Sequence, residues 1–168
     1  VLQSHLHFNQ SSYFRPHPTL HWVVRSNLVD FPNKTGGGVL NTNEDGLRGA
    51  EPLSPKGERF RILVLGDSSN FGHGVSEDEM WSKQLEQILQ NSGYPEVEVL
   101  NGACPGWTTY QAVEVLNHQY SKYQPDLVIA GFNNDSGPDF LTDRERIAHS
   151  PALGYINGLL FHSELFLL

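Results

Sequence analysis

The sequence predicts an α/β fold, a parallel β-sheet with helices on both of its faces. Two observations predict it. Short apolar segments typical of buried strands recur three times after residue 58, and segments with the apolar spacing of amphipathic helices lie between them. Strands that alternate with helices of this length are joined by crossover connections, which make neighbouring strands parallel.

The predicted elements follow one another in a regular order. The first helix is predicted over residues 78–90, where apolar residues repeat with helical spacing. Ser76 is its predicted N-cap, and the acidic residues 77–79 suit the positive end of the helix dipole. A second helix is predicted to begin near Tyr110 and to end before Pro125. The predicted strands are 60–65, 97–100 and 127–130.

The two ends of the chain differ in composition from this regular part. Residues 1–58 are rich in proline, asparagine and serine, so we predict an irregular N-terminal arm over 1–58, with 20–24 as its one strand. A single α/β domain is predicted over 59–168. The apolar segment 155–168 is too short to span a membrane and is predicted to be a core or docking helix. Because a three-stranded sheet followed by exposed leucines looks incomplete, we expect the chain to be truncated at its C-terminus.

Composition excludes several classes of function. The formal net charge of −8, without clusters of Lys and Arg, disfavours binding to nucleic acid and to anionic membrane surfaces. The single cysteine, Cys104, excludes an internal disulfide and a cysteine-based zinc site. No apolar run approaches the roughly 20 residues of a transmembrane helix. The histidines are not spaced with carboxylates as metal ligands would be, so we expect no metal and no cofactor.

Polar loops that contain glycine follow each of the three predicted strands. In an open parallel sheet, ligands bind at the carboxyl ends of the strands, where such loops converge. Glycine allows the backbone to approach a ligand closely, and the polar side chains and N–H groups can bind it. We therefore place the candidate site at these loops, which are 66–70, 101–108 and 131–135.

The three loops, taken in order, resemble the first three sequence blocks of the SGNH (GDSL-type) esterases and lipases. Gly66-Asp67-Ser68 is similar to the first block, 101–108 to the second and Asn134-Asp135 to the third. The resemblance extends over about residues 59–135, and parts of the arm are similar to the segment that precedes the first block in many bacterial members. It implies a flavodoxin-like three-layer sandwich with a parallel sheet.

The resemblance also implies roles for three residues. Ser68 corresponds to the nucleophile, exposed on a tight turn between a strand and a helix. The Gly106 N–H and the Asn134 side-chain amide correspond to donors of the oxyanion hole, which stabilises the tetrahedral intermediate. Asp67 is expected to hold the turn together. Trp107, beside Gly106, is either a residue of the substrate cleft or plain packing, and Cys104 is expected to be a small buried residue.

The sequence departs from the family pattern at several positions. Ser69 stands where the family often has leucine, and Phe132 stands where it usually has glycine, so Asn133 competes with Asn134 for the donor role. The last family block, Asp-x-x-His, is absent, and neither His149 nor His162 lies in a matching context. Either a histidine outside this segment is the base, or the chain is a non-catalytic binding or assembly module with this fold.

We therefore expect a serine ester hydrolase that forms an acyl-enzyme on Ser68. The expected substrate is a small-molecule or carbohydrate ester, with a carbohydrate O-acetyl group as one candidate. Acyl transfer to a sugar hydroxyl would use the same groups and stays open. The family resemblance of the arm favours an extracytoplasmic location. A third interpretation, in which Asp67 accepts a phosphoryl group in a receiver-like domain, lacks the acidic pair and the lysine that it requires.

Overall fold

A three-stranded parallel sheet forms the centre of the molecule. The computed structural model describes residues 12–32, 38–49, 53, 55–133 and 145. The strands lie in the order β6-β5-β7, and Ile62 of the central strand is opposite Val99 on one side and Leu127 on the other. The three predicted strands are confirmed, each to within one residue; they are β5 (Phe60–Gly66), β6 (Val97–Asn101) and β7 (Leu127–Gly131).

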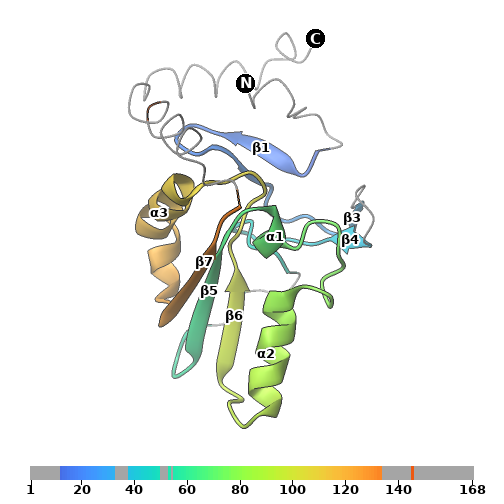
Figure 1. The fold of residues 1–168 in the computed structure, drawn as a ribbon, viewed down its shortest axis with the longest axis vertical. Coiled ribbons are helices and arrows are strands. Elements are labelled where there is room, and N and C mark those ends of the chain that lie inside the picture. Colours follow the sequence, from blue (N-terminus) through green and yellow to red (C-terminus); the bar gives the residue numbers. More distant parts are fainter. Residues whose placement is uncertain (1–11, 33–37, 50–52, 54, 134–144, 146–168) are drawn as a thin grey trace.

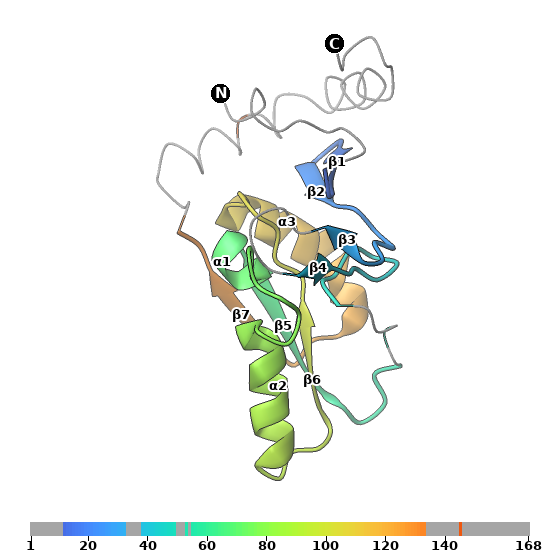
Figure 2. The same ribbon diagram turned by 90° about the vertical axis from the view of Figure 1, so that its right-hand side faces the viewer.

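One helix packs on each face of this sheet. Helix α2 (Trp81–Asn91) joins β5 to β6, and α3 (Thr109–His118), followed by the 3₁₀ turn Tyr120–Tyr123, joins β6 to β7. These two crossovers run in opposite directions along the sheet, so right-handed connections place the helices on opposite faces. Figures 1 and 2 show the sheet between α2 and α3. The predicted three-layer α/β architecture is confirmed. The prediction that the third strand is buried is wrong, because β7 is the edge strand of the described sheet and its Leu127 and Val128 are 45% and 36% exposed. None of the helices in the described ranges is long and apolar enough to cross a membrane.

The predicted start of α2 is wrong. The helix begins at Trp81, with Met80 in an extended conformation at its N-cap, and not at residue 78. Ser76 instead closes a separate turn, because its N–H and its hydroxyl donate to Glu79 Oε2 at 2.9 and 2.7 Å. Met80 is buried, and its extended backbone carries the chain from this turn to the helix. The acidic residues 77–79 therefore precede the first turn of α2.

The arm has more regular structure than its composition predicts. Two antiparallel hairpins occur in its described part, and only the strand at 20–24 was expected from the sequence. The first hairpin contains Pro16 opposite Trp22, and a proline is tolerated in such an edge strand although it usually signals a break. The hairpins are β1 (Phe14–His17) with β2 (His21–Val24), and β3 (Phe31–Pro32) with β4 (Val39–Leu40).

The arm and the sheet share one hydrophobic core. Leu20 and Leu47 from the arm are 1% and 2% exposed, and they belong to the same buried cluster as Leu63 of β5 and Val115 of α3. The division of the chain at residue 58 stays a prediction, but the described arm packs as part of the same body. Strands β1 and β2 of the arm lie beyond the carboxyl end of the sheet (Figures 1 and 2), which is the end where the candidate loops lie.

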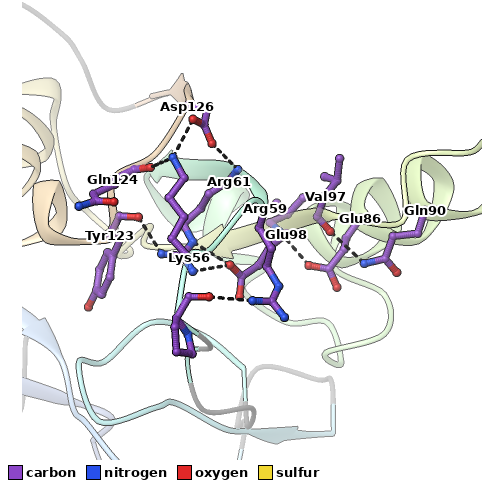
Figure 3. A network of polar contacts seen from close by, with 12 residues as sticks. Lys56, Arg59, Arg61, Glu86, Gln90, Val97, Glu98, Tyr123, Gln124 and Asp126 are labelled. Atoms are coloured by element: carbon purple, nitrogen blue, oxygen red, sulfur yellow. Dashed lines mark hydrogen bonds and ion pairs between the residues drawn. The ribbon is translucent and has the colours of Figure 1, made fainter.

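A charged network fixes the opposite end of the sheet. The Arg61 guanidinium, almost fully buried, forms an ion pair with Glu98 at 2.7 Å and donates to the carbonyl oxygen of Tyr123 at 2.7 Å. The Asp126 carboxylate accepts from the Arg61 N–H and from Lys56 Nζ, each at 2.7 Å (Figure 3). These partners join the start of β5 to the starts of β6 and β7, so the network has a structural role.

Candidate active site

Ser68 lies at the carboxyl end of the central strand, where β5 turns into the short helix α1 (Ser68–Phe71). It is the first residue of that helix and is partly exposed. Gly66 makes the turn possible, because a Cβ there would lie 2.0 Å from Asn70 Nδ2 and 2.4 Å from the Gly131 carbonyl oxygen. The second of these atoms is backbone and cannot move aside cheaply. Only glycine therefore lets β5 and β7 end this close together beside Ser68.

The Asp67 carboxylate holds this turn together. It is fully buried and caps α1 by accepting a hydrogen bond from Ser69 N at 3.0 Å. It also accepts from Ser69 Oγ at 2.7 Å and from Asn133 N at 2.5 Å. The predicted structural role of Asp67 is confirmed. A carboxylate with 0% exposure and these partners is not placed to accept a phosphoryl group.

The loop after β6, residues 101–108, runs alongside the end of β5. Gly102 N donates to Val64 O at 2.9 Å, and Cys104 N donates to Gly66 O at 3.0 Å, so the backbone pairing continues beyond the last residue of β6. Asn101 Nδ2 adds a hydrogen bond of 2.9 Å to Asn70 O in α1. These contacts attach the loop that leads to Gly106 to the turn that carries Ser68.

Gly106 lies in a tight turn formed by residues 104–107. Trp107 N donates to Cys104 O at 3.1 Å, and Gly106 has a φ of 82°. With proline at the second position and positive φ at the third, this is a type II turn. Within the described part of the chain, neither the Gly106 N–H nor the Ser68 N–H makes a hydrogen bond. These two N–H groups are therefore available to donate to a ligand, and they lie on two loops that hydrogen bonds hold together.

The third loop is described only as far as Asn133. The Asn133 side chain donates to Ser69 Oγ at 3.1 Å, so this exposed residue lies at the rim beside the Ser68 turn. Asn134 and Asp135 lie outside the described residues, and the donor role of Asn134 stays a prediction. Of the two asparagines that the sequence leaves open, Asn133 already has a partner in Ser69.

The sequence reasoning missed the contacts through which Arg48 and Asn70 support the site. The Arg48 guanidinium donates to the carbonyls of Phe71, Gly72 and Val75, and it lies over the Phe71 ring at 4.9 Å, so it fixes the end of α1. Asn70 Nδ2 donates to Gly131 O at 2.7 Å and joins α1 to the end of β7. Their acceptors are backbone carbonyls, which leave no pattern in the sequence.

His73 is the described histidine that follows Ser68 most closely in the sequence. Its Nδ1 lies 2.9 Å from the Tyr13 hydroxyl, and its backbone N–H donates to Ser68 O at 2.9 Å. Burial lowers the pKa of His73 and raises the pKa of Tyr13 to about 12. No imidazole among the described residues makes a hydrogen bond to Ser68 Oγ. His149 and His162 lie outside that part of the chain.

Trp107 does not line a substrate cleft. It is 1% exposed, and its indole N–H donates to Trp22 O at 3.0 Å, so the packing interpretation of Trp107 is the correct one. Cys104 is a small buried residue as expected, and burial raises the pKa of its thiol. Within the described ranges, no group of three or more His, Cys, Asp or Glu residues is arranged to hold a metal ion.

No protein-family model matches the chain. An arylesterase of Vibrio mimicus is 31% identical over 77 residues, which are 46% of this chain and 38% of the arylesterase. The chain resembles the SGNH/GDSL-type hydrolases. It spans less than half the length of this curated relative.

Two solved structures are similar to the chain over about half of their length. TesA has a TM-score of 0.43 with 20% identity, and the match covers 56% of this chain and 55% of TesA. AlinE4, described as an SGNH-hydrolase family esterase, has a TM-score of 0.41 with 27% identity, and the match covers 55% of this chain and 53% of AlinE4.

Proposed function

We propose that this chain carries the nucleophile and part of the oxyanion hole of a serine ester hydrolase. The observation that carries the proposal is that the N–H groups of Ser68 and Gly106 make no hydrogen bond to a described residue. They lie on two loops that hydrogen bonds join beside the partly exposed Ser68. The similarity to an arylesterase supports the same reaction class. Because the chain spans 38% of that relative, the activity is proposed for the whole protein.

In the proposed reaction, Ser68 Oγ attacks the carbonyl carbon of the ester and its proton passes to a general base. The negative oxygen of the tetrahedral intermediate accepts hydrogen bonds from the N–H groups of Ser68 and Gly106, and from the Asn134 amide. The alcohol leaves with a proton returned from the base, and water then hydrolyses the acyl-enzyme. Asp67 keeps the serine turn rigid and takes no part in proton transfer.

The general base is proposed to be a histidine that is not among the described residues. Serine is a weak nucleophile without such a base, and His73 is already bonded to Tyr13. The sequence contains no Asp-x-x-His. Because this block would supply the base, its absence supports a second candidate function, a non-catalytic binding or assembly module. The proposed substrate is a small-molecule or carbohydrate ester, with a carbohydrate O-acetyl group as one candidate.

The proposal predicts that Ser68→Ala in the full-length protein abolishes hydrolysis of p-nitrophenyl acetate. Ser68 Oγ makes no hydrogen bond to a described residue, so its removal should change the free energy of unfolding by less than about 0.5 kcal/mol. Release of nitrophenol and urea denaturation measure the two effects. Ser121→Ala, at an exposed serine on the 3₁₀ turn, is the matched control and should retain full turnover.

A fluorophosphonate probe identifies the reacting serine directly. Peptide mapping after labelling should place the adduct on Ser68 and not on Ser69, whose hydroxyl is bonded to Asp67. Unchanged turnover in Ser68→Ala would remove this serine from the mechanism. A full-length protein with neither turnover nor labelling would favour the non-catalytic module.

A further inference from the structure

The arm contacts the Gly106 turn through two buried tryptophans. Trp22 Nε1 donates to the Pro105 carbonyl oxygen at 2.9 Å, and Trp107 Nε1 donates to the Trp22 carbonyl oxygen at 3.0 Å. Trp22 and Trp107 are 2% and 1% exposed, so both indole donors are shielded from water. A neighbouring bond, from Gln111 Nε2 to Leu20 O at 2.9 Å, attaches the residue just before β2 to the start of α3.

The Pro105 carbonyl belongs to the same peptide unit as the Gly106 N–H. A trans peptide is planar, and its C=O and N–H point in opposite directions. An indole that holds the C=O therefore also fixes the direction of the N–H. A hydrogen bond accepted by the carbonyl further polarises the unit and strengthens its N–H as a donor.

The local sequence does not fix this direction by itself. Proline at the second position of a turn suits both type I and type II, and glycine at the third position accepts either sign of φ. The two turn types differ by a rotation of the peptide between these positions, which reverses its N–H. Gly106 has a φ of 82°, and a Cβ there would lie 3.1 Å from Trp22 Cζ2, so the ring packs against the turn in its type II form.

We propose that Trp22 is a positioning residue of the oxyanion hole, which holds the Pro105–Gly106 peptide so that the Gly106 N–H faces the substrate oxygen. The inference rests on the proposed function, because it assigns the Gly106 N–H to that oxygen. It gives the N-terminal arm a role in the reaction although no arm residue is proposed to touch the reacting atoms. The role belongs to the indole N–H and not only to the bulk of the ring.

The first test examines the peptide itself. In the full-length protein, Trp22→Phe keeps an aromatic ring but removes the donor, and a crystal structure of the variant should show the Pro105–Gly106 peptide rotated toward type I. A variant structure with φ of Gly106 still positive and the peptide unmoved would overturn the proposal. This measurement needs no activity, so it separates the proposal from the proposed ester hydrolysis.

The second test measures turnover of p-nitrophenyl acetate. Loss of one oxyanion donor lowers kcat by roughly 100–1,000-fold in comparable enzymes, so we expect Trp22→Phe to lower kcat by about tenfold or more. KM should change by less than about twofold, because the contact forms with the intermediate and not with the bound ester. An unchanged kcat in a protein whose turnover depends on Ser68 would overturn the positioning role.

Gln90→Met is the matched control for both tests. Gln90 Nε2 also donates to a backbone carbonyl, that of Val97, at 2.9 Å, but it does so at the far end of the sheet. This variant should keep the kcat and KM of the wild type, and a fall in kcat equal to that of Trp22→Phe would overturn the proposal. If Trp22→Phe does not fold, Trp22→3-benzothienylalanine keeps the size of the indole, lacks the N–H, and is subject to the same expectations.

Discussion

Among single residues, Asp67 combines complete burial with acceptor bonds to two different loops. Its Oδ1 accepts hydrogen bonds from Ser69 N and Ser69 Oγ, while its Oδ2 accepts one from Asn133 N. We expect Asp67→Asn to lower the free energy of unfolding by about 1–3 kcal/mol, because one carboxylate oxygen becomes an N–H₂ group that faces a donor. Urea denaturation followed by circular dichroism measures this difference.

Asp30→Asn is the matched control for this prediction. Asp30 is an exposed residue of the arm in the left-handed conformation, which asparagine also tolerates. Its replacement should change the free energy of unfolding by less than about 0.5 kcal/mol. Equal effects of the two substitutions would show that the hydrogen bonds of Asp67 do not hold the serine turn.

At the scale of elements, the first hairpin of the arm depends on a neutral histidine. His17 Nδ1 accepts a hydrogen bond from Leu20 N at 3.1 Å, which helps to close the turn between β1 and β2. Burial, aided by the nearby Arg15 charge, lowers the pKa of His17 from 6.5 to about 4. The unfolded chain therefore binds a proton at a higher pH than the folded one does.

This difference predicts a pH dependence of stability. The contribution of neutral His17 is fully present above pH 6.5 and is lost as the pH falls from 6.5 toward about 4. His17→Asn keeps an acceptor at the position of Nδ1 and cannot be protonated in this range, so the variant should lose less stability over the same interval. Urea denaturation at pH 7 and pH 5 compares the two proteins, and equal losses would contradict the prediction.

At the scale of the whole molecule, the shared core predicts that the arm and the sheet unfold together. Leu47 of the arm is 2% exposed within that core. Leu47→Ala should lower the free energy of unfolding by about 2–5 kcal/mol and shift the whole transition. Tryptophan fluorescence and far-ultraviolet circular dichroism should give coincident urea curves, as in a two-state protein.

The exposed residue Val29 provides the control for that prediction. It is 79% exposed, so Val29→Ala should change the free energy of unfolding by less than about 0.5 kcal/mol. Two separate transitions in Leu47→Ala, with the sheet unaffected, would show instead that the arm is an independent unit that ends near residue 58.

Much of the α/β part was predictable because its signals are local. The buried part of β5 contains the continuous apolar run Ile62–Leu65, and α3 repeats its apolar residues with helical spacing. The start of α2 was not predictable, because a serine followed three residues later by a glutamate occurs both at helix N-caps and in isolated turns. Here Ser76 and Glu79 form an isolated turn. The strand Phe14–His17 was not predicted, because Pro16 usually signals a break in a strand. Its pairing with β2 as an edge strand is visible only in the folded chain.

The sequence by itself determined the order of strands and helices, the three loops at the strand ends and the identity of the candidate nucleophile, because these depend on residue type and spacing along the chain. Only the tertiary structure decided which residues support that site. Trp22 reaches Pro105 across 83 positions of the chain, and Arg48 reaches the end of α1 across 23. Their acceptors are backbone carbonyls, which every residue has, so such contacts become visible only when the chain is folded.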